Sequence, residues 1–175
     1  RSKREGSAVA SGGSSVRRLA RVGEVAANNE GVEPGSVVER VVARREAAPR
    51  ADGALIVTPE YNGSIPGVLK NAIDWLSRPF GNGALKDKPL AVVGAAMGQY
   101  GGVWAHDETR KSFGLAGPRV VEDLELSIPS ASLDGKHPWE NTAVAVRLRA
   151  IFAKRVAEIG YTSRRRYGNA RPDGA

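Results

Sequence analysis

The stretch from Ala54 to Pro79 constrains the fold of this chain more than any other part of the sequence. It opens with four apolar residues, Ala54–Val57, which are enough for a buried strand but too few for a helix. Thr58-Pro59 should end that strand, because proline has no N–H to donate to a neighbouring strand. The next residues, Glu60–Gly63, are polar and have the composition of a turn. The stretch therefore predicts a strand that runs into a polar loop.

A helix is expected directly after this loop. Ser64 is the predicted N-cap, and Pro66 falls in the first turn, where its missing N–H costs nothing. Apolar residues then recur at helical spacing, namely at Val68, Leu69, Ala72, Ile73 and Leu76. Strand, loop and amphipathic helix in this order form the repeating unit of an α/β sheet, which binds ligands outside the carboxyl ends of its strands.

The same unit recurs later in the chain. A second buried strand is predicted at Pro89–Ala95, which is apolar throughout. The elements predicted after it are a glycine-containing loop over Met97–Gly102, a helix over Val103–Leu115 ending near Gly114 or Gly117, a third strand nearer the sheet edge over Arg119–Ser127, and a helix from Trp139 or Glu140 to about Ile159. Strands that alternate with helices pair in parallel through right-handed crossovers, so the predicted fold class is α/β with a parallel sheet.

The N-terminal part of the chain carries weaker signals. The predictions there are a flexible loop around Gly12–Ser15, a basic helix over Val16–Ala27, a turn at Asn28–Gly31, and a helix from Pro34 or Ser36 to Ala48. No apolar run precedes Gly6-Ser7, so a phosphate-binding loop at that point would lack the strand from which such loops begin.

Composition bounds the class of protein. A chain of 175 residues is expected to form one domain with a substantial core. It has no cysteine, which excludes disulfides, thiolate metal sites and a cysteine nucleophile. There is no apolar run of membrane-spanning length and no apolar core of a signal peptide at the start, so a cytoplasmic location is expected.

The net charge of +7 is concentrated at the two ends of the chain. A basic run such as Arg164–Arg166 is open to two interpretations, a nucleic-acid contact or a solvated tail. The solvated tail is favoured, because no set of interleaved aromatic residues and no reading helix accompanies the run.

Two loops follow consecutive strands of the predicted sheet, so both should leave the sheet at the same edge. Their polar groups are backbone amides, the amides of Asn62 and Gln99, and the phenols of Tyr61 and Tyr100. No nucleophile–base pair, metal cluster or dinucleotide fingerprint is found, and His106-Asp107 is expected to be a surface pair. These groups favour a planar, hydrogen-bonding cofactor over hydrolytic chemistry, although Tyr61 could also simply cover the sheet edge.

Residues 58–75, TPEYNGSIPGVLKNAIDW, resemble the PEYNGS signature of the NADPH-dependent FMN reductases. That family includes quinone, chromate and azo-compound reductases of the flavodoxin-like fold. Residues 90–102 are similar to the family's third flavin loop, and Asn29-Glu30 echoes a further family turn. The resemblance covers about residues 29–150.

The resemblance implies a flavodoxin-like three-layer sandwich in which loops hold FMN. The FMN-binding domain would span residues 28–159, between a poorly matching basic segment, 1–27, and a basic tail, 160–175, expected to be disordered. The residues implied to bind FMN are Pro59, Glu60, Tyr61, Asn62, Gly63, Ser64, Gly98, Gln99, Tyr100, Gly101 and Gly102. NADPH would reduce FMN by hydride transfer, and the reduced flavin would pass electrons to a quinone-like or other small oxidised acceptor. A homodimer or homotetramer is also implied.

The family's first strand and phosphate loop are missing or altered in this sequence. Their only echoes are Gly6-Ser7 and Gly13–Arg18. An alternative function follows, that of a catalytically impaired flavodoxin-like scaffold which binds FMN weakly or not at all and associates through the helix near Lys70–Pro79.

Overall fold

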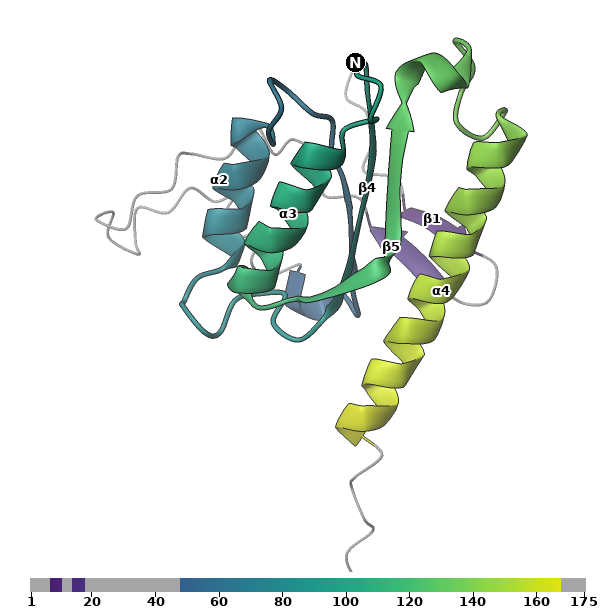
Figure 1. Cartoon of the computed structure of the whole chain (residues 1–175). Coiled ribbons are helices and arrows are strands. Elements are labelled where there is room, and N and C mark those ends of the chain that lie inside the picture. The colour runs from purple at the N-terminus through teal and green to yellow at the C-terminus, as the bar shows by residue number, and fades with distance from the viewer. Residues whose placement is uncertain (1–6, 11–13, 18–47, 168–175) are drawn as a thin grey trace, which may run out of the picture.

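The computed structural model describes residues 7–10, 14–17 and 48–167, and the fold is given for these residues. Its centre is a parallel sheet in the strand order β3-β4-β5 (Figure 1). The strands are β3 (Ala54–Val57), β4 (Pro89–Ala96) and β5 (Arg119–Pro129). Strands are confirmed at both predicted positions, and β5 extends two residues beyond its expected end. β4 is buried as predicted, but β3 is only partly buried and its Val57 is 71% exposed.

Helices cover both faces of this sheet. α2 (Gly67–Leu76) and α3 (Val103–Ala116) lie on one face, and α4 (Thr142–Tyr167) lies on the other (Figure 1). The same part of the chain also contains two short 3-10 helices, η3 (Ala48–Arg50) and η4 (Ser130–Leu133). The predicted α/β class with a parallel sheet is therefore confirmed, in three layers.

β4 is the centre of the core because helices pack against both of its faces. Leu90 and Val92 belong to the cluster beneath α2 and α3, together with Phe113. Ala91 and Val93 belong to the cluster beneath α4. Burial of alternate residues on opposite sides explains why this strand reads as a continuous apolar run.

Both boundaries of the last helix differ from the predicted ones. The last helix was expected to end at about Ile159, but α4 continues to Tyr167, so part of the expected tail is helical. It also begins at Thr142 rather than at Trp139 or Glu140. The side-chain amide of Asn141, just before the helix, accepts a hydrogen bond from the N–H of Val144 at 3.2 Å, which is the contact that an N-cap makes.

The N-terminal predictions are only partly within the described residues. β1 (Ser7–Ala10) and β2 (Ser14–Arg17) form an antiparallel pair, so the loop and helix expected around residues 14–17 are wrong. The basic helix beyond Arg17, the turn at Asn28–Gly31 and most of the helix expected to reach Ala48 lie outside the described residues.

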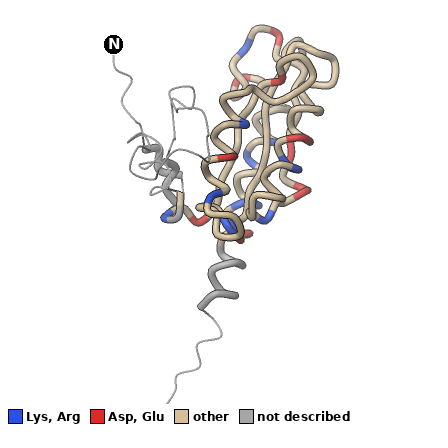
Figure 2. Tube along the Cα trace, turned by 90° about the vertical axis from the view of Figure 1, so that its left-hand side faces the viewer, with Lys and Arg blue, Asp and Glu red and all other residues tan. Residues whose placement is uncertain are grey.

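Charges of both signs are distributed over the described part of the chain (Figure 2). Several form surface ion pairs, among them Lys70–Asp74, Arg119–Glu158 and Lys154–Asp123. Such exposed pairs contribute little to stability. None of the helices in the described ranges is both long enough and apolar enough to span a membrane.

Candidate functional site

The two loops singled out in the sequence leave the sheet at the same edge. β3 and β4 are parallel and in register, with Val57 opposite Val93. The first loop (residues 59–64) follows β3 and the second loop (residues 97–102) follows β4, so both stand at the carboxyl ends of their strands. This is the edge at which α/β sheets bind their ligands.

The first loop is held by a tight turn. The backbones of Tyr61 and Ser64 exchange two hydrogen bonds of 3.0 Å each. Between them, Asn62 and Gly63 have φ angles of 52° and 71°, the left-handed conformation that Asn-Gly adopts in such turns. The turn leaves the Tyr61 side chain 62% exposed at the edge of the sheet.

The second loop depends on two glycines. The N–H of Gly101 donates to the carbonyl of Gly98 at 3.0 Å, and Gly101 and Gly102 have φ angles of 66° and 95°. Gly101 packs so closely on the end of β5 that an added Cβ would lie 2.5 Å from the carbonyl carbon of Ile128. Gly98, Gln99 and Tyr100 remain exposed, whereas the two glycines are buried.

Glu60 connects the first loop to the helix that follows the second loop. Its Oε2 accepts a hydrogen bond from the N–H of Ala105 at 3.1 Å. α3 has no side-chain cap at its own N-cap, Gly102, so Glu60 satisfies one of the amides that every helix start leaves unpaired. A carboxylate is also electrostatically favourable at a helix N-terminus.

Ser64 and Glu108 form a second connection between the first loop and α3. The Ser64 hydroxyl donates to Glu108 Oε2 at 2.6 Å, and the N–H of Ile65 donates to the same oxygen at 3.4 Å. The prediction that Ser64 caps the next helix is wrong, because α2 begins after Pro66 and the Ser64 hydroxyl is already bound to Glu108. Sequence reasoning missed Glu108, because its partner Ser64 lies 44 positions away and no local pattern links the two residues.

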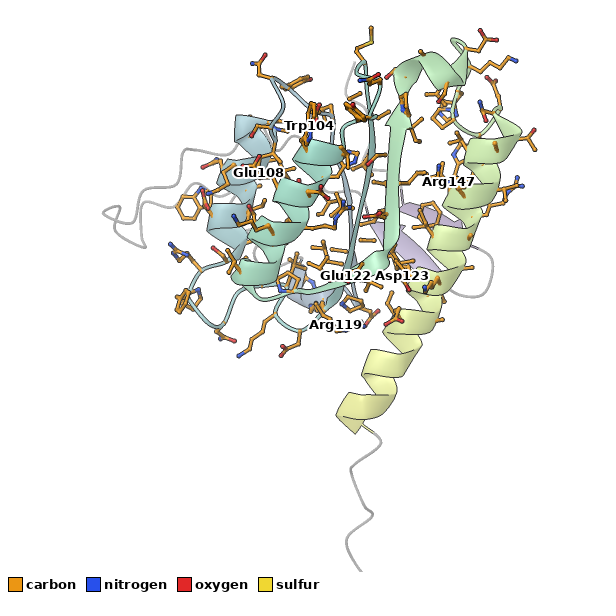
Figure 3. All side chains as sticks on the ribbon, viewed as in Figure 1. Trp104, Glu108, Arg119, Glu122, Asp123 and Arg147 are labelled. Atoms are coloured by element: carbon orange, nitrogen blue, oxygen red, sulfur yellow. The ribbon has the colours of Figure 1, made fainter. Side chains whose placement is uncertain are left out.

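Replacing Glu108 with alanine should loosen the first loop. Two hydrogen bonds to a carboxylate are lost, so we expect the free energy of unfolding to fall by about 1–2 kcal/mol. Urea denaturation measures this loss. Glu108→Gln should retain at least half of the stability, since its carbonyl oxygen still accepts both bonds. The exposed Glu122, labelled in Figure 3, provides a control whose change to alanine should have little effect. An equal, negligible loss in both alanine variants would contradict this role of Glu108.

An aromatic pair lies beside both loops. The rings of Tyr100 and Trp104 have centroids 5.4 Å apart at an angle of 58°. Trp104 also lies close to the first loop, because a Cβ placed on Gly63 would be 3.9 Å from its indole. Trp104 is 54% exposed and Tyr100 is 55% exposed, and Figure 3 shows Trp104 near the start of α3. Trp104 was not among the predicted site residues. It is the second residue of α3 and lies two positions after the end of the second loop.

His106 is fully buried, so the expectation of a surface pair with Asp107 is wrong for the histidine. Its Nε2 lies 3.1 Å from the carbonyl oxygen of Thr58, and its Nδ1 lies 2.6 Å from the hydroxyl of Ser127. Asp107 is exposed and pairs with Arg110. His106 shares the buried side of α3 with Thr109 and Phe113, and this spacing of three and seven residues was the signal in the sequence.

Comparison with known protein families matches residues 12–133 to the NADPH-dependent FMN reductases. This match covers well over half of the chain and includes both loops. The chain belongs to that family. The match begins and ends earlier than the range of residues 29–150 over which the motif resemblance was expected to extend.

Curated relatives of this chain include a quinone reductase of Pseudomonas putida, which is 42% identical to it over 119 residues. That alignment covers 67% of the chain and 61% of the relative. An NAD(P)H-dependent FMN reductase of Pseudomonas aeruginosa is 37% identical over 113 residues, covering 65% of the chain and 60% of the relative. The chain thus spans about three fifths of the length of these curated relatives.

A solved structure supports the flavodoxin-like fold of this family member. FerB from Paracoccus denitrificans, described as a flavoenzyme NAD(P)H:(acceptor) oxidoreductase, aligns with a TM-score of 0.64 at 28% sequence identity. The alignment covers 82% of this chain and 78% of FerB. The flavodoxin-like architecture implied by the sequence motif is therefore confirmed.

Proposed function

We propose that this protein is a flavin-dependent oxidoreductase that binds FMN, takes electrons from NADPH and passes them to a quinone-like or other small oxidised acceptor. The observation that carries this proposal is the placement of the first and second loops at one edge of a parallel sheet. Membership of the FMN reductase family supports it.

The groups at this edge fit the ring system of FMN. The exposed side chains of Tyr61, Asn62, Gln99 and Tyr100 combine flat apolar surface with hydrogen-bonding groups, which a planar heterocycle requires. The buried glycines of the second loop bring backbone close to the same edge. The residues proposed to hold FMN are Pro59, Glu60, Tyr61, Asn62, Gly63, Ser64, Gly98, Gln99, Tyr100, Gly101 and Gly102.

These residues divide into two roles. The side chains of Glu60 and Ser64 are bonded to α3, so they hold the first loop in place. Tyr61, Asn62 and residues 98–100 of the second loop are exposed and would contact the ring itself. FMN, when bound, supplies the electron-transfer chemistry, and the protein binds and orients it.

The aromatic surface suggests which acceptors the site accepts. Tyr61, Tyr100 and Trp104 each expose more than half of their surface beside the loops. Exposed aromatic rings favour flat, ring-shaped ligands by stacking and by burial of apolar area. This preference agrees with the name of the quinone reductase of Pseudomonas putida.

Self-association is proposed for the α2 side of the molecule. Val68 on α2 is 47% exposed, and Phe80, just beyond the helix, is 89% exposed. Aromatic side chains such as that of Phe80 are enriched at protein interfaces relative to the rest of the surface. We propose a homodimer or homotetramer that uses this surface.

A cytoplasmic location remains a prediction.

NADPH consumption in the presence of FMN and 1,4-benzoquinone tests the proposed activity. The protein should accelerate NADPH oxidation above the rate with free FMN. In the Tyr61→Ala/Asn62→Ala variant the rate should fall at least about tenfold, because one good hydrogen bond and one ring contact to FMN are lost. Arg147→Ala, an exposed change on α4 in the opposite layer, should leave the rate unchanged. A wild-type rate equal to that of free FMN would reject the activity and favour the scaffold alternative.

A further inference from the structure

We propose that His106 is a positioning residue that fixes the first loop relative to the second and thereby determines how tightly FMN is held. The inference rests on the proposed FMN site. His106 itself is fully buried beneath the edge, so it does not act by contacting a ligand.

The contacts of His106 connect the bases of both loops and the neighbouring strand. Nε2 contacts the carbonyl oxygen of Thr58, the residue that immediately precedes the first loop, at 3.1 Å. The ring also lies against Gly102, the last residue of the second loop, since a Cβ there would be 3.2 Å from its Cε1. Nδ1 lies 2.6 Å from the hydroxyl of Ser127 on β5. A single residue therefore links three segments that are far apart in the sequence.

The partners determine the protonation state of the ring. A backbone carbonyl can only accept, so Nε2 must carry the hydrogen that is donated to Thr58. In the neutral imidazole Nδ1 is then an acceptor, and the Ser127 hydroxyl donates to it. Both ring nitrogens are satisfied in one tautomer, which keeps the ring orientation unique.

The surrounding backbone leaves one place for the ring. A Cβ on Gly94 would lie 2.5 Å from Nε2, and a Cβ on Gly102 would lie 3.2 Å from Cε1. The imidazole therefore occupies space that two residues without side chains provide, one on β4 and one at the start of α3. Close packing of this kind makes the contact with Thr58 rigid.

Burial supports the neutral form. It lowers the pKa of His106 below the ordinary value of 6.5, and Arg110 acts in the same direction. The hydrogen bond to Thr58 and the carboxylates of Glu60 and Asp107 oppose this shift. The imidazole is thus neutral at physiological pH, and acid conditions would charge it inside the protein.

Removal of the imidazole should release the end of β3. In His106→Leu the Thr58 carbonyl and the Ser127 hydroxyl lose their partner in a buried position. The first loop then varies in its distance from the second loop, and a ligand held by both loops binds more weakly.

The experiment measures the dissociation constant of FMN by quenching of flavin fluorescence in wild type, His106→Leu, His106→Gln and Ser127→Ala. We expect His106→Leu to raise this constant at least about tenfold, and His106→Gln by less than about threefold, because its amide N–H can reach the Thr58 carbonyl. Ser127→Ala should be intermediate. If His106→Leu does not fold, the order wild type, Gln variant, Ser127→Ala carries the test.

Two controls separate positioning from general stability. Ile151→Val destabilises the core on the α4 side of the sheet, so it should lower Tm while changing the FMN dissociation constant by less than about twofold. In wild type this constant should also rise more steeply than in His106→Gln as the pH falls through the lowered pKa of His106, which lies below 6.5. Protonation places a charge on a buried ring and forces the Ser127 hydroxyl to turn from donor to acceptor.

Three results would overturn the inference. The first is His106→Leu binding FMN as tightly as wild type, and the second is Ile151→Val losing as much affinity as His106→Leu at equal Tm. Failure of Ser127→Ala to weaken binding beyond His106→Gln is the third. If wild type itself does not bind FMN, the proposed function fails and this inference fails with it, which is a pattern distinct from the other three.

Discussion

Replacing Gly94 with alanine is expected to lower the free energy of unfolding by about 3 kcal/mol or more, since the added methyl group overlaps fixed backbone. A Cβ at this position would lie 1.9 Å from the carbonyl oxygen of Thr58 and 2.5 Å from Nε2 of His106. Gly94 is buried in β4 at the middle of the sheet, so neither neighbour can move without breaking their mutual hydrogen bond. Urea denaturation of the purified variant measures the loss.

Gly67→Ala is the matched control for this substitution. Gly67 begins α2, and a Cβ there meets no atom within 4 Å. Alanine is the better helix former, so this variant should be as stable as wild type or more stable by up to about 1 kcal/mol. A Gly94→Ala protein that unfolds at the same urea concentration as Gly67→Ala would show that β4 and the end of β3 are not packed as described.

Gly101→Ala should damage both stability and FMN binding. The residue has a φ of 66°, and its Cβ would lie 2.5 Å from the carbonyl carbon of Ile128 and 2.6 Å from the nitrogen of Pro129. The left-handed conformation alone costs an alanine about 1–2 kcal/mol, and the overlap with backbone brings the expected loss to about 2–4 kcal/mol. Because the second loop must move away from β5 to relieve the overlap, the FMN dissociation constant should rise at least about tenfold.

Gly98→Ala tests whether this effect comes from the position rather than from the loss of a glycine. Gly98 is in the same loop, it is exposed, and a Cβ there meets no atom within 4 Å. The stability of the Gly98→Ala protein without FMN should stay within about 0.5 kcal/mol of wild type, as for other surface changes. Equal losses in the two variants, measured by thermal and urea unfolding, would contradict the close packing of Gly101 on β5.

The parts of the fold that could be predicted are those in which one segment carries its own signal. The run that begins at Pro89 is apolar throughout because helices bury both faces of β4. The bounds of this strand and of Ala54–Val57 match the predicted ones closely. The Asn62-Gly63 turn was also predictable, since that pair adopts left-handed angles readily. The first and second loops therefore lie, as predicted, at the same edge of the sheet, at the carboxyl ends of β3 and β4.

The parts that could not be predicted depend on contacts between distant segments. Ser64 has the residue type of an N-cap, but its hydroxyl binds Glu108, 44 positions further along the chain. His106 has a charged neighbour and reads as a surface residue, although Thr58 and Ser127 satisfy it in the interior. Local sequence does not contain these partners, so only the folded arrangement reveals which polar side chains hold the loops.

The central claim is that the first and second loops together grip FMN, and direct titration of the purified protein with FMN tests it. We predict a yellow protein whose bound flavin fluorescence is quenched to saturation, with binding that is at least about tenfold weaker in the Tyr61→Ala/Asn62→Ala variant. A wild-type protein that stays colourless in excess FMN, or that binds FMN equally well without these two side chains, would contradict the claim.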